Sequence, residues 1–248
     1  MKLLILNPNM SVEMTTAMGR VASGVVAPDT ELILATAPYG FPYISSRAEA
    51  QIAGVIALEM IAERQAEVDA VVIAAYGDPG LRAARELFDM PIIGMAESAM
   101  LTACMAGEKF SLVTFTKNLA PWYLESVTSA GLRSRLASIR IPNEDFRSVL
   151  NVQHELHAQL LAEVAVCVEE DQADVVILGG APLAGMAHKV TDSPAVLIDP
   201  ISAAVKQAEA MYQVTPRGAN AGSMQRPPTK PNEGLNPTLG NWIARRTT

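Results

Sequence analysis

The chain has 248 residues, of which 50% are hydrophobic and 18% are charged, and its formal net charge is -7. This composition predicts an acidic globular protein that forms one large domain or two of about 100 to 125 residues, and we favour two. It argues against nucleic acid and against an anionic membrane as partners.

The N-terminal segment MKLLILNPN has a short apolar stretch that a polar Asn-Pro-Asn turn ends. A signal peptide needs a longer apolar region, so we interpret this segment as a first strand. The sequence contains no apolar run of about 18 residues, the length that crosses a membrane as a helix. We expect a cytoplasmic protein.

Apolar runs of strand length alternate with helical patterns along the chain. Expected strands are KLLILN, ELILATA, AVVIAAY, PIIGMA, FSLVTF, LASIRI, DVVILGG and VLIDP. The expected helices cover about 11–23, 46–67, 81–88, 95–106, 119–131 and 145–170, a short stretch after DVVILGG, and a last segment that ends at Tyr212. Continuous apolar strands between helices indicate parallel sheets covered on both faces, so the fold class is α/β.

The two halves of the chain carry a related pattern. VDAVVIAAYGDPGL and QADVVILGGAPLAGM each hold an acidic residue, a buried strand and a turn of small residues, with Ala75 opposite Gly180. We therefore predict two pseudosymmetric Rossmann-like lobes with parallel sheets whose carboxyl ends face one cleft. The predicted boundaries are 1–100 plus about 200–213 for the first lobe and 101–199 for the second.

Residues 214–248 form a Pro- and Gly-rich C-terminal tail with little periodicity. Such a segment buries too little apolar area to order itself alone. Two outcomes stay open: a mobile tail, or a tail that Trp242 and Ile243 anchor on a neighbouring subunit.

The cysteines and histidines give no pattern typical of a metal site. Cys104 and Cys167 lie in apolar helical runs, where a buried small side chain is the usual role. His154 and His157 are one helical turn apart, but HELH differs from the HExxH zinc pattern and fits a solvated helix face. We expect no metal site and no cofactor.

The turn after the first strand, LNPNMS, places Asn7, Asn9 and Ser11 at the start of a helix. The free N–H groups of that helix start, with Ser11 as a candidate N-cap, favour a pocket for an anion or a carbonyl oxygen. An Asx-Pro turn with a purely structural cap is the alternative.

LNPN at the first strand, YGDPGL at the third and LGG…AGMA in the second half together resemble the aspartate/glutamate racemase superfamily, most closely its hydantoin and allantoin racemase branch. The resemblance spans about residues 1–212. It implies that a small substrate lies between two cysteines, one from each lobe, which remove and return a proton on the carbon beside a carbonyl. It also implies a homo-oligomer.

The sequence departs from that pattern at both thiols. The position of the first cysteine is Ala75 and that of the second is Gly180. Neither residue can carry a proton, and Cys104 and Cys167 map to helices away from the strand ends. The two-thiol mechanism is therefore absent, although the rest of the cleft matches.

Several polar residues remain at the predicted cleft. His188 is the candidate acid or base by residue type, since histidine is the usual general acid or base near neutral pH, and Arg47 is a candidate clamp for a carboxylate. Tyr76 is expected to pack or to donate a hydrogen bond. The other candidate substrate-binding residues are Tyr43, Asp78, Thr114, Thr116, Gly179 and Ala181. The structural alternatives are an exposed helix-start histidine, a solvated arginine and an Asx turn at Asp78.

Two functions follow from these observations. The first is an enzyme that acts on a small cyclic ureide, an imide or an amino-acid-like carboxylate by isomerase, lyase or hydrolase chemistry without paired thiols. The second is a catalytically inactive protein that binds a small metabolite in the same cleft.

Overall fold

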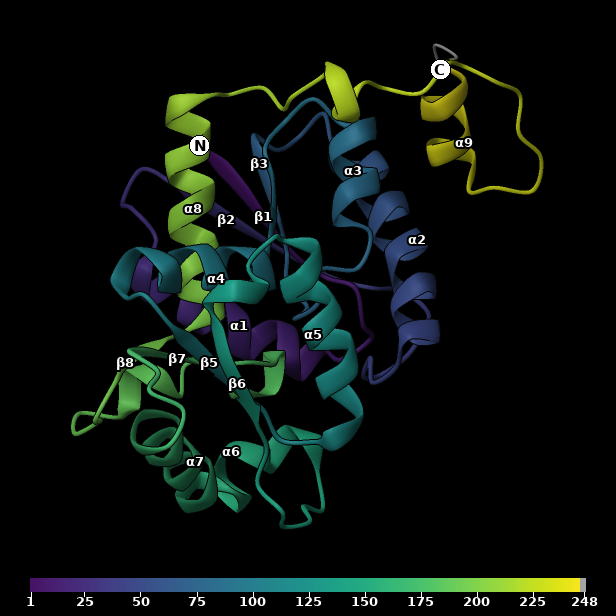
Figure 1. Cartoon of the computed structure of the whole chain (residues 1–248). Coiled ribbons are helices and arrows are strands. Elements are labelled where there is room, and N and C mark those ends of the chain that lie inside the picture. The colour runs from purple at the N-terminus through teal and green to yellow at the C-terminus, as the bar shows by residue number, and fades with distance from the viewer. Residues whose placement is uncertain (246–248) are drawn as a thin grey trace.

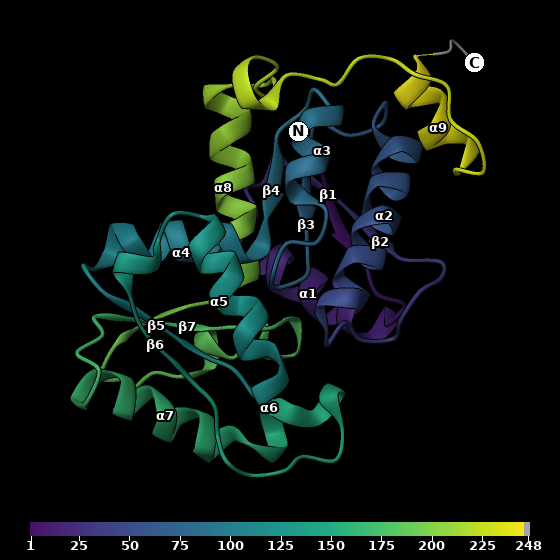
Figure 2. The same cartoon turned by 45° about the vertical axis from the view of Figure 1, so that its right-hand side comes forward.

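The computed structural model describes residues 1–245 and holds two four-stranded parallel sheets (Figure 1). The strand orders are β2-β1-β3-β4 and β6-β5-β7-β8, so each half repeats the same topology. Figure 2 shows the two sheets one above the other, with helices around both. The predicted α/β class with two pseudosymmetric lobes is confirmed.

The first sheet and its helices come from the N-terminal part of the chain and from one late helix. Their bounds are β1 Lys2–Asn7, α1 Val12–Val25, β2 Glu31–Thr36, α2 Arg47–Arg64, β3 Ala70–Ile73, α3 Leu81–Leu87, β4 Ile92–Gly94 and α8 Pro200–Val214.

The second sheet starts after α4, which runs over Met95–Ala106. The bounds that follow are β5 Phe110–Val113, α5 Ala120–Ser129, β6 Leu136–Arg140, α6 Val152–Glu155, α7 His157–Glu169, β7 Val175–Leu178 and β8 Val196–Ile198, with short 3₁₀ turns η1 Lys117–Leu119, η2 Arg133–Arg135, η3 Val149–Asn151, η4 Ala181–Leu183 and η5 Ala187–Lys189.

Side-chain alternation along the central strands separates two cores. Leu3 and Ile5 of β1 face the core that α1, α4 and α8 share with the second lobe. Leu4 and Leu6 face a smaller core under α2 and α3. Because successive side chains of a strand point to opposite faces, a strand with helices on both sides is apolar at every position.

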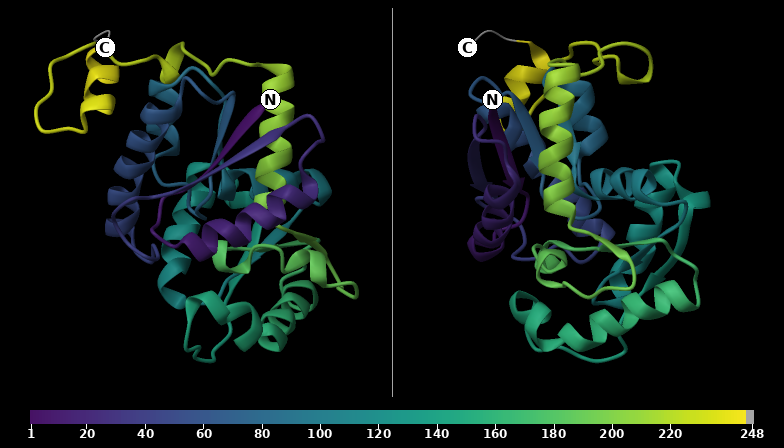
Figure 3. Two further views of the ribbon diagram at one scale, coloured as in Figure 1. Left: turned by 180° about the vertical axis from the view of Figure 1, so that it is seen from behind. Right: turned by 90° about the vertical axis from the view of Figure 1, so that its left-hand side faces the viewer.

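The helix α8 returns to the first sheet after the chain has completed the second (Figures 1 and 3). It packs against α1, α4, β3 and β4. The helix α4 in turn contacts β4 of the first sheet and β7 and β8 of the second. These two helices join the lobes, while the exact domain boundaries stay a prediction.

One predicted helix is wrong. The sequence pattern predicted a single helix over about 145–170, but a 3₁₀ turn, a one-turn α6 and α7 occupy this stretch, with a break at Leu156. Gln153 on α6 donates to the carbonyls of Pro182 and Ala184 at 2.9 and 2.8 Å. A tertiary contact therefore holds the first turn away from the line of α7.

The tail folds back on the first lobe of its own chain. Its helix α9, Pro237–Ala244, contacts α2. Trp242 stacks on Phe88 with ring centroids 5.8 Å apart and donates from Nε1 to the Leu87 carbonyl at 2.8 Å. Arg226 lies over the indole at 5.0 Å and pairs with Asp89 at 2.9 Å. Trp242 therefore anchors the tail on its own chain, which differs from both outcomes left open by the sequence, a mobile tail and an anchor on a neighbouring subunit.

Candidate active site

The two central strands end in matching turns at the junction of the lobes. The N–H of Ala74 donates to the Leu6 carbonyl and that of Gly179 to the Val113 carbonyl, each at 2.8 Å. Ala75 and Gly180 are therefore the first residues beyond the two ladders. A Cβ built on Gly179 would lie 3.4 Å from Cζ of Tyr76, so the two turns meet face to face.

A small cavity of about 20 Å³ lies between these turns. Its lining residues are Asn9, Tyr43, Ile44, Ala75, Tyr76, Trp122, Tyr123 and Ala181. The predicted residues Asn9, Tyr43, Ala75, Tyr76 and Ala181 thus come together here. A cavity of this size holds about one water molecule.

Gly180 adjoins the cavity in a conformation that requires glycine. Its φ of +133° lies in a region that residues with a Cβ rarely adopt, and a Cβ there would meet Phe115 at 3.0 Å and the Tyr123 hydroxyl at 3.6 Å. Ala75 is 6% exposed and lines the cavity. Neither residue offers a titrating group.

Tyrosines dominate the polar surface of the cavity. The rings of Tyr76 and Tyr123, one from each lobe, lie 4.6 Å apart. Burial raises the pKa of Tyr43, Tyr76 and Tyr123 above the ordinary value of 10.0. All three phenols are therefore neutral at physiological pH and act as hydrogen-bond donors rather than bases.

Two buried hydroxyls have no hydrogen-bond partner within the described residues, Tyr76 Oη and Thr114 Oγ1. Thr114 follows β5 and is fully buried. An unpaired buried polar group costs about 1–3 kcal/mol. A bound acceptor such as a carbonyl oxygen would remove that cost for Tyr76, whose side chain lines the cavity.

The Asn-Pro-Asn turn is a connected network at the start of α1. Asn7 Nδ2 donates to Asn9 Oδ1 at 2.9 Å and to Thr15 Oγ1 at 2.9 Å. Ser11 is the N-cap and accepts from the Met14 N–H at 3.1 Å. Asn7 and Ser11 therefore position Asn9, whose amide lines the cavity and whose Nδ2 contacts the Met14 sulfur at 3.7 Å.

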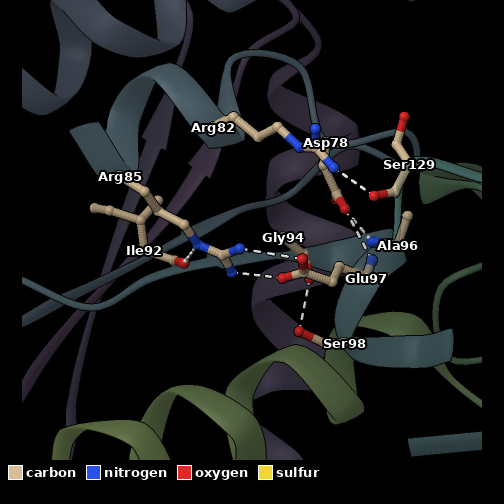
Figure 4. A network of polar contacts seen from close by, with 9 residues as sticks. All are labelled: Asp78, Arg82, Arg85, Ile92, Gly94, Ala96, Glu97, Ser98 and Ser129. Carbon is tan, nitrogen blue, oxygen red and sulfur yellow. Dashed lines mark hydrogen bonds and ion pairs between the residues drawn. The ribbon is translucent and has the colours of Figure 1, made fainter. Parts of the chain in front are cut away.

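The Gly-Asp-Pro-Gly turn connects β3 to α3, and its Asp78 side chain contacts the start of α4 (Figure 4). Asp78 has a φ of +52°, and its two carboxylate oxygens accept from the N–H groups of Ala96 and Glu97, each at 2.8 Å. The side chain thereby caps the first turn of α4. Burial raises the pKa of Asp78 from 3.8 to about 7, against the lowering effect of the two N–H donors.

Arg47 and Thr116 lie outside the cavity lining. The Arg47 guanidinium forms a two-nitrogen ion pair with Glu125 of α5, with Nε at 2.8 Å and Nη2 at 2.5 Å from Oε1. Both side chains are more than half exposed. Thr116 is the half-buried N-cap residue of η1. Arg47 thus engages a carboxylate of the protein itself at the edge of the interlobe junction.

His188 is exposed on η5 and does not line the cavity. Its Nε2 lies 2.7 Å from Ser202 Oγ, which donates to Asp199 at 2.9 Å. The sequence pattern placed this histidine at the mouth of the second-lobe turn, but η5 carries it to the start of α8. Asp199 also accepts from the Gly185 N–H, so this cluster holds the long turn after β7 against α8.

Both cysteines lie on helices, as predicted, Cys104 on α4 and Cys167 on α7. Burial raises the pKa of both thiols, which disfavours the thiolate that a proton acceptor needs. Neither side chain lines the cavity. Within residues 1–245, no group of three potential ligands gathers closely enough to hold a metal ion.

Sequence reasoning missed Ile44, Trp122 and Tyr123, which complete the cavity. The signal was the Pro-Trp-Tyr triplet that opens α5 after the strand β5, at the same sheet edge as the other turns. None of the residues that line the cavity is charged, so its walls favour a neutral polar group over a carboxylate.

Comparison with known proteins gives consistent results. The model of the Asp/Glu/Hydantoin racemase family matches residues 3–208. A hydantoin racemase from Paenarthrobacter aurescens is 33% identical over 233 residues, which cover 93% of this chain and 99% of that protein.

Solved structures show the same similarity. An allantoin racemase from Klebsiella pneumoniae superposes with a TM-score of 0.90 at 30% identity and covers 96% of this chain and 98% of its own. An allantoin racemase from Pseudomonas fluorescens superposes with a TM-score of 0.88 at 25% identity, with coverage of 94% and 100%. Within residues 1–245, no helix is both long enough and apolar enough to cross a membrane.

Proposed function

The chain belongs to the Asp/Glu/Hydantoin racemase family, a family of isomerases, and from this premise we propose that it binds a small cyclic ureide or imide between its lobes and promotes proton exchange on the carbon beside a ring carbonyl. The observation that carries the proposal is the uncharged interlobe cavity with the unpartnered Tyr76 hydroxyl.

The cavity chemistry supports polarisation of a carbonyl. When the proton leaves the ring carbon, its bonding electrons pass to the carbonyl oxygen, which becomes an enolate oxygen. A neutral Tyr76 hydroxyl that donates to this oxygen is more favourable in the enolate than in the ground state. The side-chain amide of Asn9, another lining residue, supplies a second donor. These donors act without a change in their own charge.

The proton acceptor in this proposal is a solvent or buffer base. The thiol positions are Ala75 and Gly180, and the three tyrosines that line the cavity stay protonated. The base takes the proton from one face of the ring, and water returns a proton to either face. Such a mechanism makes the rate depend on buffer base concentration, in contrast to a reaction with two built-in thiols.

The second candidate is a protein that binds the same ligand without chemistry. The observation in its favour is that, among the described lining residues, no side chain titrates near neutral pH. Both candidates require a neutral cyclic ligand at the cavity, and they differ in what happens to its acidic carbon.

Deuterium exchange separates the two. The protein is incubated in D₂O with allantoin or hydantoin at several imidazole concentrations, and exchange at the ring carbon is followed by NMR beside a protein-free control. We expect exchange above the control that rises with imidazole. Tyr76→Phe, which keeps the ring and removes the donor, should lower it by about tenfold to a hundredfold. Binding without exchange would favour the second candidate. The absence of both binding and exchange would contradict the two candidates together.

We also propose that the chain acts in the cytoplasm, which follows from the interpretation of its N-terminal segment as a strand, and that it forms a homo-oligomer, which rests on the family resemblance. Sedimentation velocity over a range of protein concentrations tests the assembly. A single species with the mass of one chain at all concentrations would contradict it.

A further inference from the structure

A cyclic ureide is larger than the interlobe cavity of about 20 Å³, so the cavity must widen before a ligand enters. Beside it lies an open cleft of about 520 Å³, a volume typical of small-molecule sites. The cleft runs between α2, the Gly77–Gly80 turn and α5. Within the described residues, one side chain lines both spaces, that of Trp122.

Trp122 is the wall between the cleft and the cavity. Its side chain is 8% exposed, and its indole lies directly against the backbone of Gly77, where any Cβ would collide with the ring. Gly77 has a φ of +105°, which favours glycine for a second reason. On its other side Trp122 packs near Tyr123, and the centroids of the two rings are 5.9 Å apart. Rotation of the indole toward the cleft would join the two spaces.

We propose that Trp122 gates ligand access from the open cleft to the interlobe cavity, and that the Arg47–Glu125 ion pair latches this gate. The inference rests on the proposed function in one respect, since it takes the cavity as the destination of the ligand. The cleft then serves as the vestibule in which a neutral ring ligand waits beside α2 and α5.

The latch joins the helix that carries the gate to the opposite lobe. Glu125 lies one turn after Trp122 on α5, and Arg47 is the first residue of α2. Arg82 of α3 makes a second link across the cleft when it donates to the Ser129 carbonyl at the end of α5 (Figure 4). Because the Arg47–Glu125 pair is exposed, salt screens it and its rupture is easy.

The test needs no ligand. Ala75→Cys places a thiol in the cavity, and its rate of reaction with iodoacetamide, measured by peptide mass spectrometry, reports how often the cavity opens. This readout separates the introduced thiol from Cys104 and Cys167. It also keeps a failure of the gate distinct from a failure of the proposed function, which deuterium exchange measures.

We expect Trp122→Ala in the Ala75→Cys background to raise the labelling rate roughly tenfold or more, since it removes the wall itself. Arg47→Gln should raise it by about two- to fivefold, and added salt should accelerate labelling in the parent but not in Arg47→Gln. The matched control is Leu124→Ala, which alters a 37% exposed neighbour on α5 that lines neither space and should change nothing.

Two results would overturn the gate. One is an unchanged rate in a folded Trp122→Ala variant, and the other is an equal rise in Leu124→Ala. If Trp122→Ala fails to fold, Arg47→Gln tests the gate instead, because Arg47 is exposed and its substitution leaves the core intact. An unchanged rate in Arg47→Gln, with no response of the parent to salt, would then contradict both gate and latch.

Discussion

At the scale of single residues, the two neighbouring glycines after β7 differ in what they tolerate. Gly180 has a φ of +133° and a close neighbour in Phe115, whereas a Cβ on Gly179 would make ordinary contacts at 3.4 to 3.6 Å. We predict that Gly180→Ala lowers the free energy of unfolding by about 1–3 kcal/mol, and that Gly179→Ala changes it by less than about 0.5 kcal/mol. Urea denaturation of the two variants beside the parent measures both.

Equal losses in the two variants would contradict this difference. The same geometry bears on the family pattern, since a cysteine at residue 180 would be strained in this backbone. A double substitution Ala75→Cys with Gly180→Cys is thus expected to need a local backbone change before the second thiol can face the first.

Asp78 gives a pH-dependent prediction. Its pKa is 3.8 in an unfolded chain and about 7 in the folded one, so between these values the folded state holds a proton that the unfolded state has lost. The contribution of Asp78 to stability therefore falls as the pH rises from about 4 to about 7 and is constant above. Asp78→Asn removes this titration.

The measurement is the difference in free energy of unfolding between the parent and Asp78→Asn from pH 4.5 to 7.5. We expect the advantage of the parent to shrink as the pH rises through this window. A constant or growing advantage would show that the two N–H donors of α4 outweigh burial and hold the Asp78 carboxylate ionised.

At the scale of elements, the docked tail depends on one indole. Trp242 stacks on Phe88, bonds to the Leu87 carbonyl and lies under Arg226. We predict that Trp242→Ala releases α9 and raises the rate of limited proteolysis within residues 215–236 by about tenfold or more. Trp242→Phe keeps the stacking and should show a smaller rise. Tail cleavage equal to that of the parent in Trp242→Ala would contradict this anchor.

The strands were predictable from the sequence because each lies in a short, mostly apolar run between two helical patterns. All eight predicted strands are present, and the inner strands β1, β3, β5 and β7 give the clearest apolar pattern because they are buried on both faces. The break at Leu156 was not predictable, because Gln153 bends the chain through a contact with the turn after β7, far away in sequence.

The site was predictable to a similar extent. The turns around Asn9, Ala75 and Tyr76 follow strand ends and were found by pattern. His188 was placed too close to the cavity because the length of a turn does not reveal its path. Trp122 was missed because its role depends on Gly77, a contact between lobes that no local pattern encodes.

At the scale of the whole molecule, the two lobes share the larger of the two cores. The cluster that holds Leu3 and Ile5 of the first sheet also holds Val175 and Ile177 of the second, and α4 contacts strands of both sheets. A loss of packing in one lobe therefore removes support from the other. We expect the two lobes to unfold together as one cooperative unit rather than one after the other.

Leu160→Ala tests this cooperativity. Leu160 is fully buried on α7, so its truncation should cost about 2–5 kcal/mol. The strands on which α7 packs most, β5 and β6, both belong to the second sheet. Native-state hydrogen exchange then reads the loss strand by strand. If the core is shared, amides of β1 and β3 lose as much protection as those of β5 and β7.

Ile61→Ala, which truncates a side chain in the core under α2, is the reciprocal variant and should lower protection in the second sheet. Loss confined to the sheet beside each substitution would mean that the lobes open separately, and the cavity between them would then open by movement of a whole lobe rather than of Trp122 alone.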